Sequence, residues 1–239
     1  ALPQKTLKNL LTMVNFAMAQ QDLRYYLNGV LLVIEGSTVK AVATDGHRLA
    51  YCEAEGLEGG GSRHEVIIPR KTVLELSRLL AETDDMVRVN LAANQAKFIF
   101  SEITLITKLV EGKFPDYQRV IPKNHEHLIQ LDRETLQRSL QRASILTSDK
   151  FRGIRWVLTP GKLTFVASNS DQEEARDEIE VQYSGPEIDV GFNVNYLLDV
   201  LNNLKTENVQ FALQDNNSSA LVTTSGLDDF KYVVMPMRI

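Results

Sequence analysis

The sequence predicts an α+β fold with two similar domains in tandem, each with antiparallel strands and two helices that cover one sheet face. Two observations lead to this prediction. Apolar stripes of helical period alternate with short strand-like runs, and the order of these elements occurs twice along the chain. Residues 69–80 correspond to 193–204 at an offset of 124, and further matches keep that offset. The domains are therefore predicted at 1–117 and 118–239.

The first copy begins with a predicted helix from Pro3 to Gln20, in which Pro3 suits the first turn. A second helix is predicted from Arg70 to Leu80. Asp45-Gly46 predicts a type I′ hairpin turn, since glycine adopts φ > 0 without steric cost. The strands of this copy are predicted at 30–34, 39–43, 48–51, 66–68, 87–91, 97–100 and 104–109.

In the second copy, Asp132 is the predicted N-cap of a helix from Arg133 to Ala143. A further helix is predicted from Val194 to Leu204. Residues 171–180 hold six acids and one arginine and are placed on an outer stretch. The strands of this copy are predicted at 155–158, 163–167, 209–213, 220–224 and 232–235.

Composition limits the class of protein. The chain has 239 residues, a formal net charge of −5 and one cysteine, Cys52. A single cysteine excludes an intramolecular disulfide and fits a reducing compartment. Without a charged-then-apolar leader or a long apolar run, we expect a soluble protein that is neither secreted nor embedded in a membrane. The net acidity argues against tight DNA binding, unless positive charge is gathered on one surface.

Several motifs carry a resemblance to a known family. They are RYYLNG at 24–29, TDGHRL at 44–49, KFPDYQRV at 113–120, KFRG at 150–153, GFNVNYLLDVL at 191–201 and YVVMPMRI at 232–239. Together they resemble the bacterial DNA polymerase III beta subunit, the sliding clamp family. The resemblance implies tandem DNA-clamp domains, the family's middle and C-terminal ones, with sheets outside and helices on the inner face. It also implies that the family's first domain is missing here.

A function follows from this resemblance. In the family, three such domains make a subunit, and two subunits make a ring that encircles duplex DNA. The implied role is that of a DNA polymerase processivity factor in DNA replication, in the cytoplasm at the nucleoid. Short Gln-Leu-x-Leu-Phe-type motifs bring polymerases, the clamp loader and repair proteins to a hydrophobic pocket. The alternative is a protein-binding adaptor that does not encircle DNA, which the acidic balance also suits.

The implied partner-peptide pocket combines the hairpin at 44–49 with the apolar segment 232–239, near the junction of the two domains. Apolar members would bury a partner's Leu and Phe, while His47, Arg48 and backbone groups would hold its polar ends. Two plainer interpretations stay open: the hairpin is only a turn, and the last segment is only a buried strand. The resemblance assigns to the pocket Leu27, Thr44, Gly46, His47, Arg48, Leu49, Pro115, Arg119, Val120, Phe151, Asn193, Tyr196, Ser219, Val233, Val234, Met235, Pro236, Met237 and Arg238.

Basic residues gather on the predicted helices, whereas acids gather on the predicted strands. No acid occurs within residues 1–21. Weak attraction to phosphates is independent of sequence and lets a protein move along a duplex. The alternatives are ordinary solvated faces, with Tyr25 and Tyr26 as core aromatics. The residues predicted to face DNA are Lys5, Lys8, Gln21, Arg24, Tyr25, Tyr26, Lys71, Arg138 and Arg142.

Ile145 and Leu146 follow the third predicted helix and match the edge that closes the ring in the family. As core residues they would be unremarkable. The ring closes between the first domain of one subunit and the third domain of the next. We therefore expect the full-length protein to be a homodimer and the present chain to be a monomer that does not encircle DNA.

No catalytic residue, metal site or cofactor is predicted. His47 lies beside Asp45, but such pairs are common in hairpin turns. His125 and His127 lack a third ligand at the usual metal spacing. The glycine-rich loop at 59–61 lacks a phosphate-binding lysine and does not open a helix. We therefore expect a non-catalytic subunit of a polymerase holoenzyme.

Overall fold

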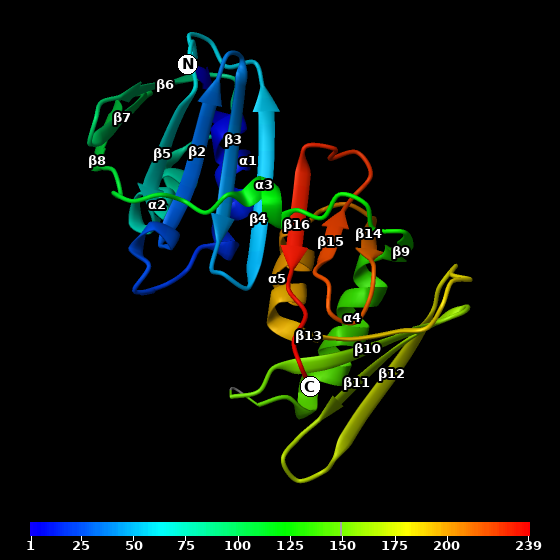
Figure 1. Cartoon of the computed structure of the whole chain (residues 1–239). Coiled ribbons are helices and arrows are strands. Elements are labelled where there is room, and N and C mark those ends of the chain that lie inside the picture. Colours follow the sequence, from blue (N-terminus) through cyan, green and yellow to red (C-terminus); the bar gives the residue numbers. More distant parts are fainter. Residues whose placement is uncertain (149) are drawn as a thin grey trace. The chain divides into compact units, whose positions relative to one another are not determined.

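The computed structural model describes residues 1–148 and 150–239. It contains two compact units, Ala1–Tyr117 (unit 1) and Gln118–Ile239 (unit 2). Each unit carries its own sheets and its own pair of long helices (Figure 1). The predicted α+β class with antiparallel sheets is confirmed.

Unit 1 contains two α-helices, α1 (Gln4–Val14) and α2 (Arg70–Leu79), and two short 3₁₀ helices, η1 (Asn15–Ala17) and η2 (Tyr25–Leu27). Its strands are β1 (Leu2–Pro3), β2 (Gly29–Glu35), β3 (Thr38–Thr44), β4 (Arg48–Glu55), β5 (His64–Pro69), β6 (Met86–Leu91), β7 (Gln95–Phe100) and β8 (Ile103–Lys108). They are ordered β1-β6-β7-β8 in one sheet and β5-β2-β3-β4 in the other. Helix α1 contacts β3 and β4, and α2 contacts β2 and β5, so both helices cover the same sheet face (Figure 1).

Unit 2 begins within the short helix α3 (Tyr117–Val120). Its long helices are α4 (Arg133–Ala143) and α5 (Val194–Asn203), and η3 (Ser144–Leu146) continues α4. Its strands are β9 (His127–Asp132), β10 (Gly153–Thr159), β11 (Lys162–Ser168), β12 (Glu174–Glu180), β13 (Ile188–Asn193), β14 (Asn208–Leu213), β15 (Ala220–Thr223) and β16 (Phe230–Val234). They are ordered β12-β11-β10-β13 and β16-β15-β14-β9.

The two units have the same topology. In each unit, the first strand (β1 or β9) leads directly into the first long helix. The next four strands form one sheet, and the last of these four leads directly into the second long helix. Thus β5 ends at Pro69 and α2 begins at Arg70, while β13 ends at Asn193 and α5 begins at Val194. The internal repeat seen in the sequence is therefore a repeat of a whole folding unit.

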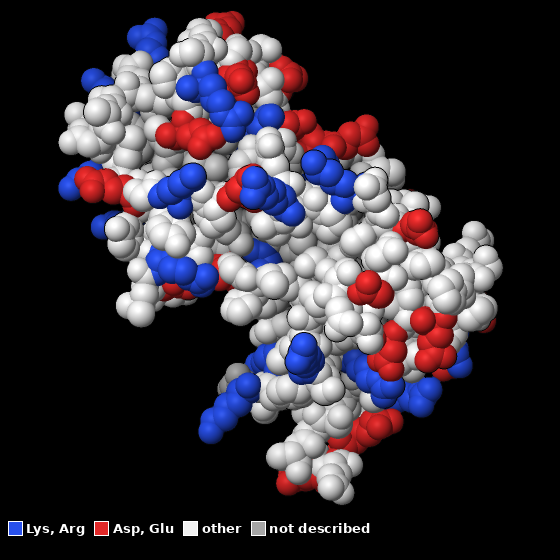
Figure 2. All heavy atoms as spheres, in the orientation of Figure 1, with Lys and Arg blue, Asp and Glu red and all other residues white. Residues whose placement is uncertain are grey.

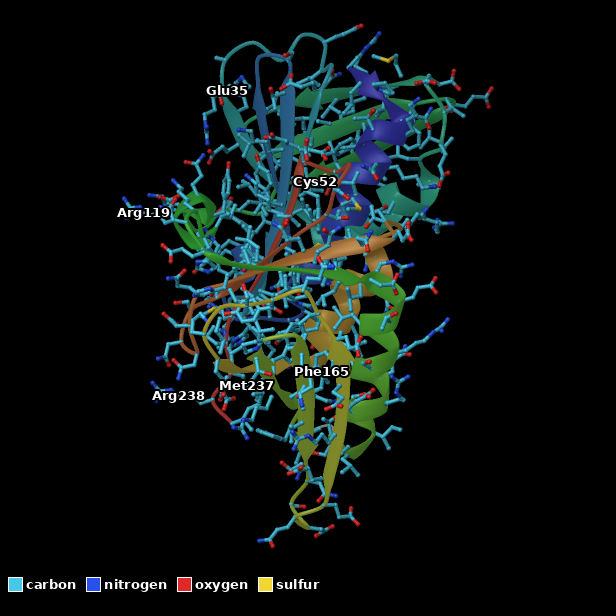
Figure 3. All side chains as sticks on the ribbon, turned by 90° about the vertical axis from the view of Figure 1, so that its right-hand side faces the viewer. Glu35, Cys52, Arg119, Phe165, Met237 and Arg238 are labelled. Atoms are coloured by element: carbon cyan, nitrogen blue, oxygen red, sulfur yellow. The ribbon has the colours of Figure 1, made fainter. Side chains whose placement is uncertain are left out.

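An aromatic cluster forms the core of unit 2. The ring of Trp156 lies 5.3 Å from that of Phe165, 5.5 Å from that of Phe192 and 4.9 Å from that of Phe211, measured between centroids. All four side chains are fully buried, and Phe165 is labelled within this unit in Figure 3. Such ring pairs add packing energy to the burial of apolar area.

Several predicted boundaries were wrong. The first helix was predicted to reach Gln20, but α1 ends at Val14 and η1 follows it. Met18 adopts an extended conformation, and the amide of Ala19 bonds to the carbonyl of Leu27 instead of continuing the helix. Strand β1 was not predicted, because its two residues are too few to show a period. Strands β9 and β13 were not predicted either.

Candidate peptide-binding site

The first part of the predicted site is the hairpin between β3 and β4. Its last strand pair is Thr44 and Leu49, so the loop is longer than the predicted two-residue turn. Gly46 has φ of 91°, but Asp45 does not have a positive φ, so the type I′ prediction was wrong. The reason is the Asp45 side chain, whose Oδ1 accepts hydrogen bonds from the amides of His47 (2.9 Å) and Arg48 (3.1 Å).

Two arginines surround this hairpin. Arg48 Nε lies 3.1 Å from Asp45 Oδ2, and both side chains are largely buried. Arg24 pairs with both carboxylate oxygens of Asp22 at 3.0 and 2.9 Å and lies 3.4 Å from the Asp45 carbonyl. Hydrogen bonds from Arg24 lower the pKa of Asp22 to about 2. A Cβ on Gly46 would lie 3.1 Å from the Arg24 guanidinium, so the arginine packs over the glycine.

The predicted pocket residues of unit 1 differ in accessibility. Gly46, His47 and Pro115 are exposed, whereas Leu27 and Leu49 are buried. Thr44 is also buried, and its hydroxyl donates to the carbonyl of Arg48 at 2.6 Å. The hairpin therefore presents its turn to solvent and keeps its apolar side chains in the interior.

The second part of the predicted site is the last segment of unit 2. Strand β16 ends at Val234, and Val233 and Val234 are fully buried, as the interpretation of a buried strand expects. The next five residues, Met235–Ile239, are here called the tail. Met235 is 46% exposed, and Met237 and Arg238 lie next to each other at the outer side of unit 2 in Figure 3. Apolar side chains are thus accessible in the tail but not in β16.

The tail and its neighbours are held by main-chain bonds. The amide of Met237 donates to the carbonyl of Gly191 at 2.7 Å. The Tyr232 hydroxyl donates to the carbonyl of Tyr196 at 2.8 Å, which links β16 to α5. Asn193 caps α5 by accepting bonds from the amides of Asn195 and Tyr196. Predicted residues Asn193, Tyr196 and Val233 therefore belong to one connected part of unit 2.

Other predicted pocket residues of unit 2 lie on separate elements. Arg119 and Val120 are exposed on α3, and Figure 3 shows Arg119 apart from Met237 and Arg238. Phe151 is exposed beside the start of β10. The carbonyl of Ser219 accepts a bond of 2.6 Å from His125 Nε2.

Acids lie beside several of the basic residues that were predicted to face DNA. Lys5 Nζ lies 2.6 Å from Asp84 Oδ1, and Lys8 Nζ lies 3.8 Å from Glu82 Oε1. The loop after α2 places these acids there, because its carbonyls at 83 and 85 accept the first amides of α1. On α4, Arg142 pairs with Asp177 of β12 at 2.7 Å, and Arg138 lies 3.4 Å from Glu134. Figure 2 shows basic and acidic side chains interspersed on the face that it presents.

Tyr25, which was predicted to face DNA, and Ile145, which was predicted at the ring-closing edge, are accessible to solvent. Tyr25 is 60% exposed and meets Tyr26 edge to face, with centroids 6.2 Å apart, so Tyr25 is not a core aromatic. Ile145 is 78% exposed, which excludes a core role for it, and Leu146 is half-buried. Both lie on η3, which contacts β12, and β12 pairs only with β11 among the described strands.

Two family models match the chain, one after the other. The model described as DNA polymerase III beta subunit, central domain, matches residues 1–116, and the model described as DNA polymerase III beta subunit, C-terminal domain, matches residues 118–238. The chain belongs to the DNA polymerase III beta subunit family. The family predicted from the motifs is therefore confirmed.

Members of the beta subunit family resemble the chain throughout. The beta sliding clamp of Pseudomonas aeruginosa is 49% identical over 239 residues, which are 100% of this chain and 65% of that protein. A crystal structure of the P. aeruginosa sliding clamp with ligand matches with a TM-score of 0.96 over the same shares. Another, bound to griselimycin, matches with a TM-score of 0.94 at 49% identity over 99% of this chain and 64% of that one. The chain spans about 65% of the length of the relative proteins, and these relatives do not favour the adaptor alternative.

Residues that were not assigned to the predicted site also shape it in this beta subunit chain. Asp22 and Asn28 exchange hydrogen bonds of 3.0 and 2.9 Å and so form the loop that carries Arg24. Gly191 accepts the hydrogen bond that anchors the tail. It was not assigned to the pocket, although it is the first residue of the matched motif at 191–201. The signal for Asp22 and Asn28 is a pair of polar residues on either side of Arg24. The signal for Gly191 is a glycine within a strand. The described helices include none with the length and apolar content needed to cross a membrane. No group of three metal-ligating residues is found within 1–148 and 150–239.

Proposed function

We propose that this chain is part of a sliding clamp, a non-catalytic DNA polymerase processivity factor of the bacterial cytoplasm and nucleoid. As a full-length homodimer it encircles duplex DNA and tethers polymerases and other replication and repair proteins. The observation that carries the proposal is the exposed apolar tail of unit 2, bonded to β13, in a chain that belongs to the beta subunit family.

The tail supplies the apolar part of a peptide-binding surface. Met235 and Met237 have flexible, polarizable side chains that adapt to different apolar partners. A partner that buries them would lower the free energy, because the transfer of apolar area out of water is favourable. A Leu or Phe of a Gln-Leu-x-Leu-Phe peptide has the chemistry to do so. The clamp relative that binds griselimycin supports a ligand site in this family.

We also propose that polar groups of the hairpin in unit 1 take part in the recognition of partner proteins. Gly46 and His47 are exposed at the turn, and Arg48 is held in place by Asp45. An arginine whose position is already fixed loses less conformational entropy when it binds a ligand. We assign the remaining predicted pocket residues to the same function.

The experiment that tests the peptide surface is a fluorescence titration with a labelled Gln-Leu-Ser-Leu-Phe peptide. We expect a Kd in the micromolar range, which corresponds to ~8 kcal/mol. A chain that ends at Val234 should bind at least about tenfold more weakly, since it loses the apolar contacts. Unchanged affinity after this trimming would refute the tail as the peptide surface.

A matched pair of methionines provides the control. Met235 and Met86 are similarly exposed, at 46% and 41%, but Met86 lies on β6 of unit 1, outside the proposed surface. Met235→Ala should weaken peptide binding about tenfold, and Met86→Ala should leave the Kd unchanged. Equal losses in the two variants would indicate nonspecific adsorption of the peptide to exposed apolar side chains.

The ring-closing edge is the proposed contact with the other subunit of the full-length protein. Ile145 offers an exposed apolar side chain beside the unpaired edge of β12. An unpaired strand edge accepts a further strand through main-chain hydrogen bonds. Three of the four exposed residues of β12 are acidic, namely Glu174, Glu178 and Glu180, so a strand with basic residues would complement this edge.

A further inference from the structure

Two glycines of unit 2 lie beneath the tail. Gly153 begins β10, and Gly191 lies on the neighbouring strand β13. A Cβ on Gly191 would come closer to the carbonyl oxygen of Met237 than real Cβ atoms do, and would lie 2.7 and 2.8 Å from Cδ1 and Cγ1 of Ile239. A Cβ on Gly153 would lie 2.9 Å from Phe151 Cζ and 3.1 Å from Ile239 Cδ1. At Gly191 a backbone atom of the tail therefore lies where any Cβ would be, whereas at Gly153 only side-chain ends lie that close.

Backbone conformation does not explain the glycines. Neither Gly153 nor Gly191 has the positive φ that favours glycine. Glycine within a strand weakens the strand, because it has no side chain to pack and loses more entropy on folding. A close approach of another segment remains as the physical reason for both residues.

Unit 1 provides an internal comparison. Ile67 lies three residues before α2, as Gly191 lies three residues before α5. The carbonyl of Ile67 also accepts a main-chain bond, from the amide of Val110 at 3.0 Å. The bond alone is therefore compatible with a large side chain. What is particular to unit 2 is that the Met237 carbonyl and Ile239 lie directly over Gly191.

We infer that Gly191 is a positioning residue for the peptide-binding tail, and that Gly153 contributes to the same close contact with the tail. This inference rests on the proposed function. Val234 is fixed by its pairing with Ala220, and Met237 is fixed by its bond to Gly191. Met235 and Pro236 thus form a short bridge between two anchored points. The contact at these glycines sets which way the tail methionines point, and so prepares the surface before a peptide arrives.

The test compares the same methyl addition at the two glycines. Gly191→Ala meets a backbone carbonyl, which cannot move without releasing the tail. Gly153→Ala meets only the ends of two flexible side chains. We expect Gly191→Ala to raise the hydrogen-exchange rate of the Met237 amide and to weaken peptide binding, each at least about fivefold, the factor that corresponds to one ordinary hydrogen bond. Gly153→Ala should have a smaller effect on both.

A second substitution separates the two glycines further. Ile239→Ala should relieve most of the effect of Gly153→Ala, because it removes one of the crowding side chains. It should not relieve Gly191→Ala, where the Met237 carbonyl remains in the way. Unchanged exchange of unit 1 amides in all variants is the folding control.

The outcomes distinguish this inference from the proposed function. If the Met237 amide of Gly191→Ala exchanges its hydrogen at the wild-type rate, the inference is overturned, whatever the peptide affinity of this variant. If the Met237 amide exchanges faster but the peptide affinity is unchanged, the positioning role is overturned, while the proposed function stands. If the wild-type chain binds no peptide, the proposed function fails, and with it the positioning role.

Discussion

At the scale of the residue, Asp45 organises the hairpin of unit 1. Its carboxylate accepts two backbone amides and pairs with Arg48, so one side chain fixes both the turn and the arginine. The DG pair in the sequence predicted a hairpin here, and a hairpin is present. The turn type could not be predicted from the pair alone, because Asp45 forms its own side-chain turn and remains at negative φ.

Asp45→Ala should destabilise this hairpin by about 1–2 kcal/mol, since it leaves two amides without their acceptor and Arg48 without its ion pair. Asp45→Asn keeps a side-chain oxygen for the amides and should lose less. Hydrogen exchange of β3 and β4 amides measures both changes. Equal protection in Asp45→Ala and the wild type would show that the carboxylate does not hold the turn.

At the scale of the element, α4 was predicted from Arg133 to Ala143, and it has these bounds. Its signals are local, because Asp132 accepts the amide of Thr135 and Leu136 and Leu140 form the buried stripe. The end of α1 was not predictable in this way. Ala17 and Met18 continue the apolar stripe in sequence and are buried, but Ala17 ends the 3₁₀ helix η1 and Met18 is extended.

Replacing the cap tests this local account. Asp132→Ala should destabilise unit 2 by about 1 kcal/mol, whereas Asp132→Asn should be nearly neutral, since asparagine caps helices as well as aspartate does. Urea unfolding followed by Trp156 fluorescence reports unit 2 alone, because the sequence has one tryptophan. An equal loss in both variants would contradict the capping role.

The same cap predicts a pH dependence. Hydrogen bonds from Thr135 hold the pKa of Asp132 below its ordinary value of 3.8. A lowered folded-state pKa stabilises the fold above 3.8, and this contribution disappears as the pH falls through the folded-state value. The stability of the wild type relative to Asp132→Asn should therefore decline below pH 3.8. A constant difference between pH 6 and pH 2.5 would contradict this assignment.

At the scale of the whole molecule, the charges are balanced locally. The repeated domains and the family followed from order and motifs spread along the chain. The pairing of Lys5 with Asp84 could not be predicted, because the two residues are distant in sequence and meet only in the folded unit. The same holds for Arg142 and Asp177. Basic residues that the sequence places on one helix face therefore produce a weaker positive potential in the folded protein, because acids from other segments lie beside them.

This balance predicts weak and unequal contributions to DNA binding. Lys71 is exposed, and no acid of the described chain lies within ion-pair distance of it, whereas Lys5 is neutralised by Asp84. In the full-length protein at low salt, Lys71→Ala should lower the affinity for duplex DNA of random sequence and reduce the slope against log salt by about one. Lys5→Ala should change both less. The reverse order would place the DNA-facing surface elsewhere.

The oligomeric prediction also belongs to this scale. We expect the 239-residue chain to be monomeric in small-angle scattering, since the proposed ring closes through a domain outside it. In the full-length protein, Ile145→Ser should weaken the dimer, because it removes an exposed apolar contact at the proposed edge. A stable ring formed by the 239-residue chain would contradict this account of closure.

The central claim is that the tail binds partner peptides, and methyl NMR of the methionines tests it most directly. The sequence has five methionines. Met13 and Met18 are buried in unit 1, Met86 is exposed there, and Met235 and Met237 belong to the tail. A Gln-Leu-Ser-Leu-Phe peptide should shift the Met235 and Met237 signals with one saturable, micromolar curve and leave the other three in place. Saturable binding with the two tail signals unmoved would contradict the account.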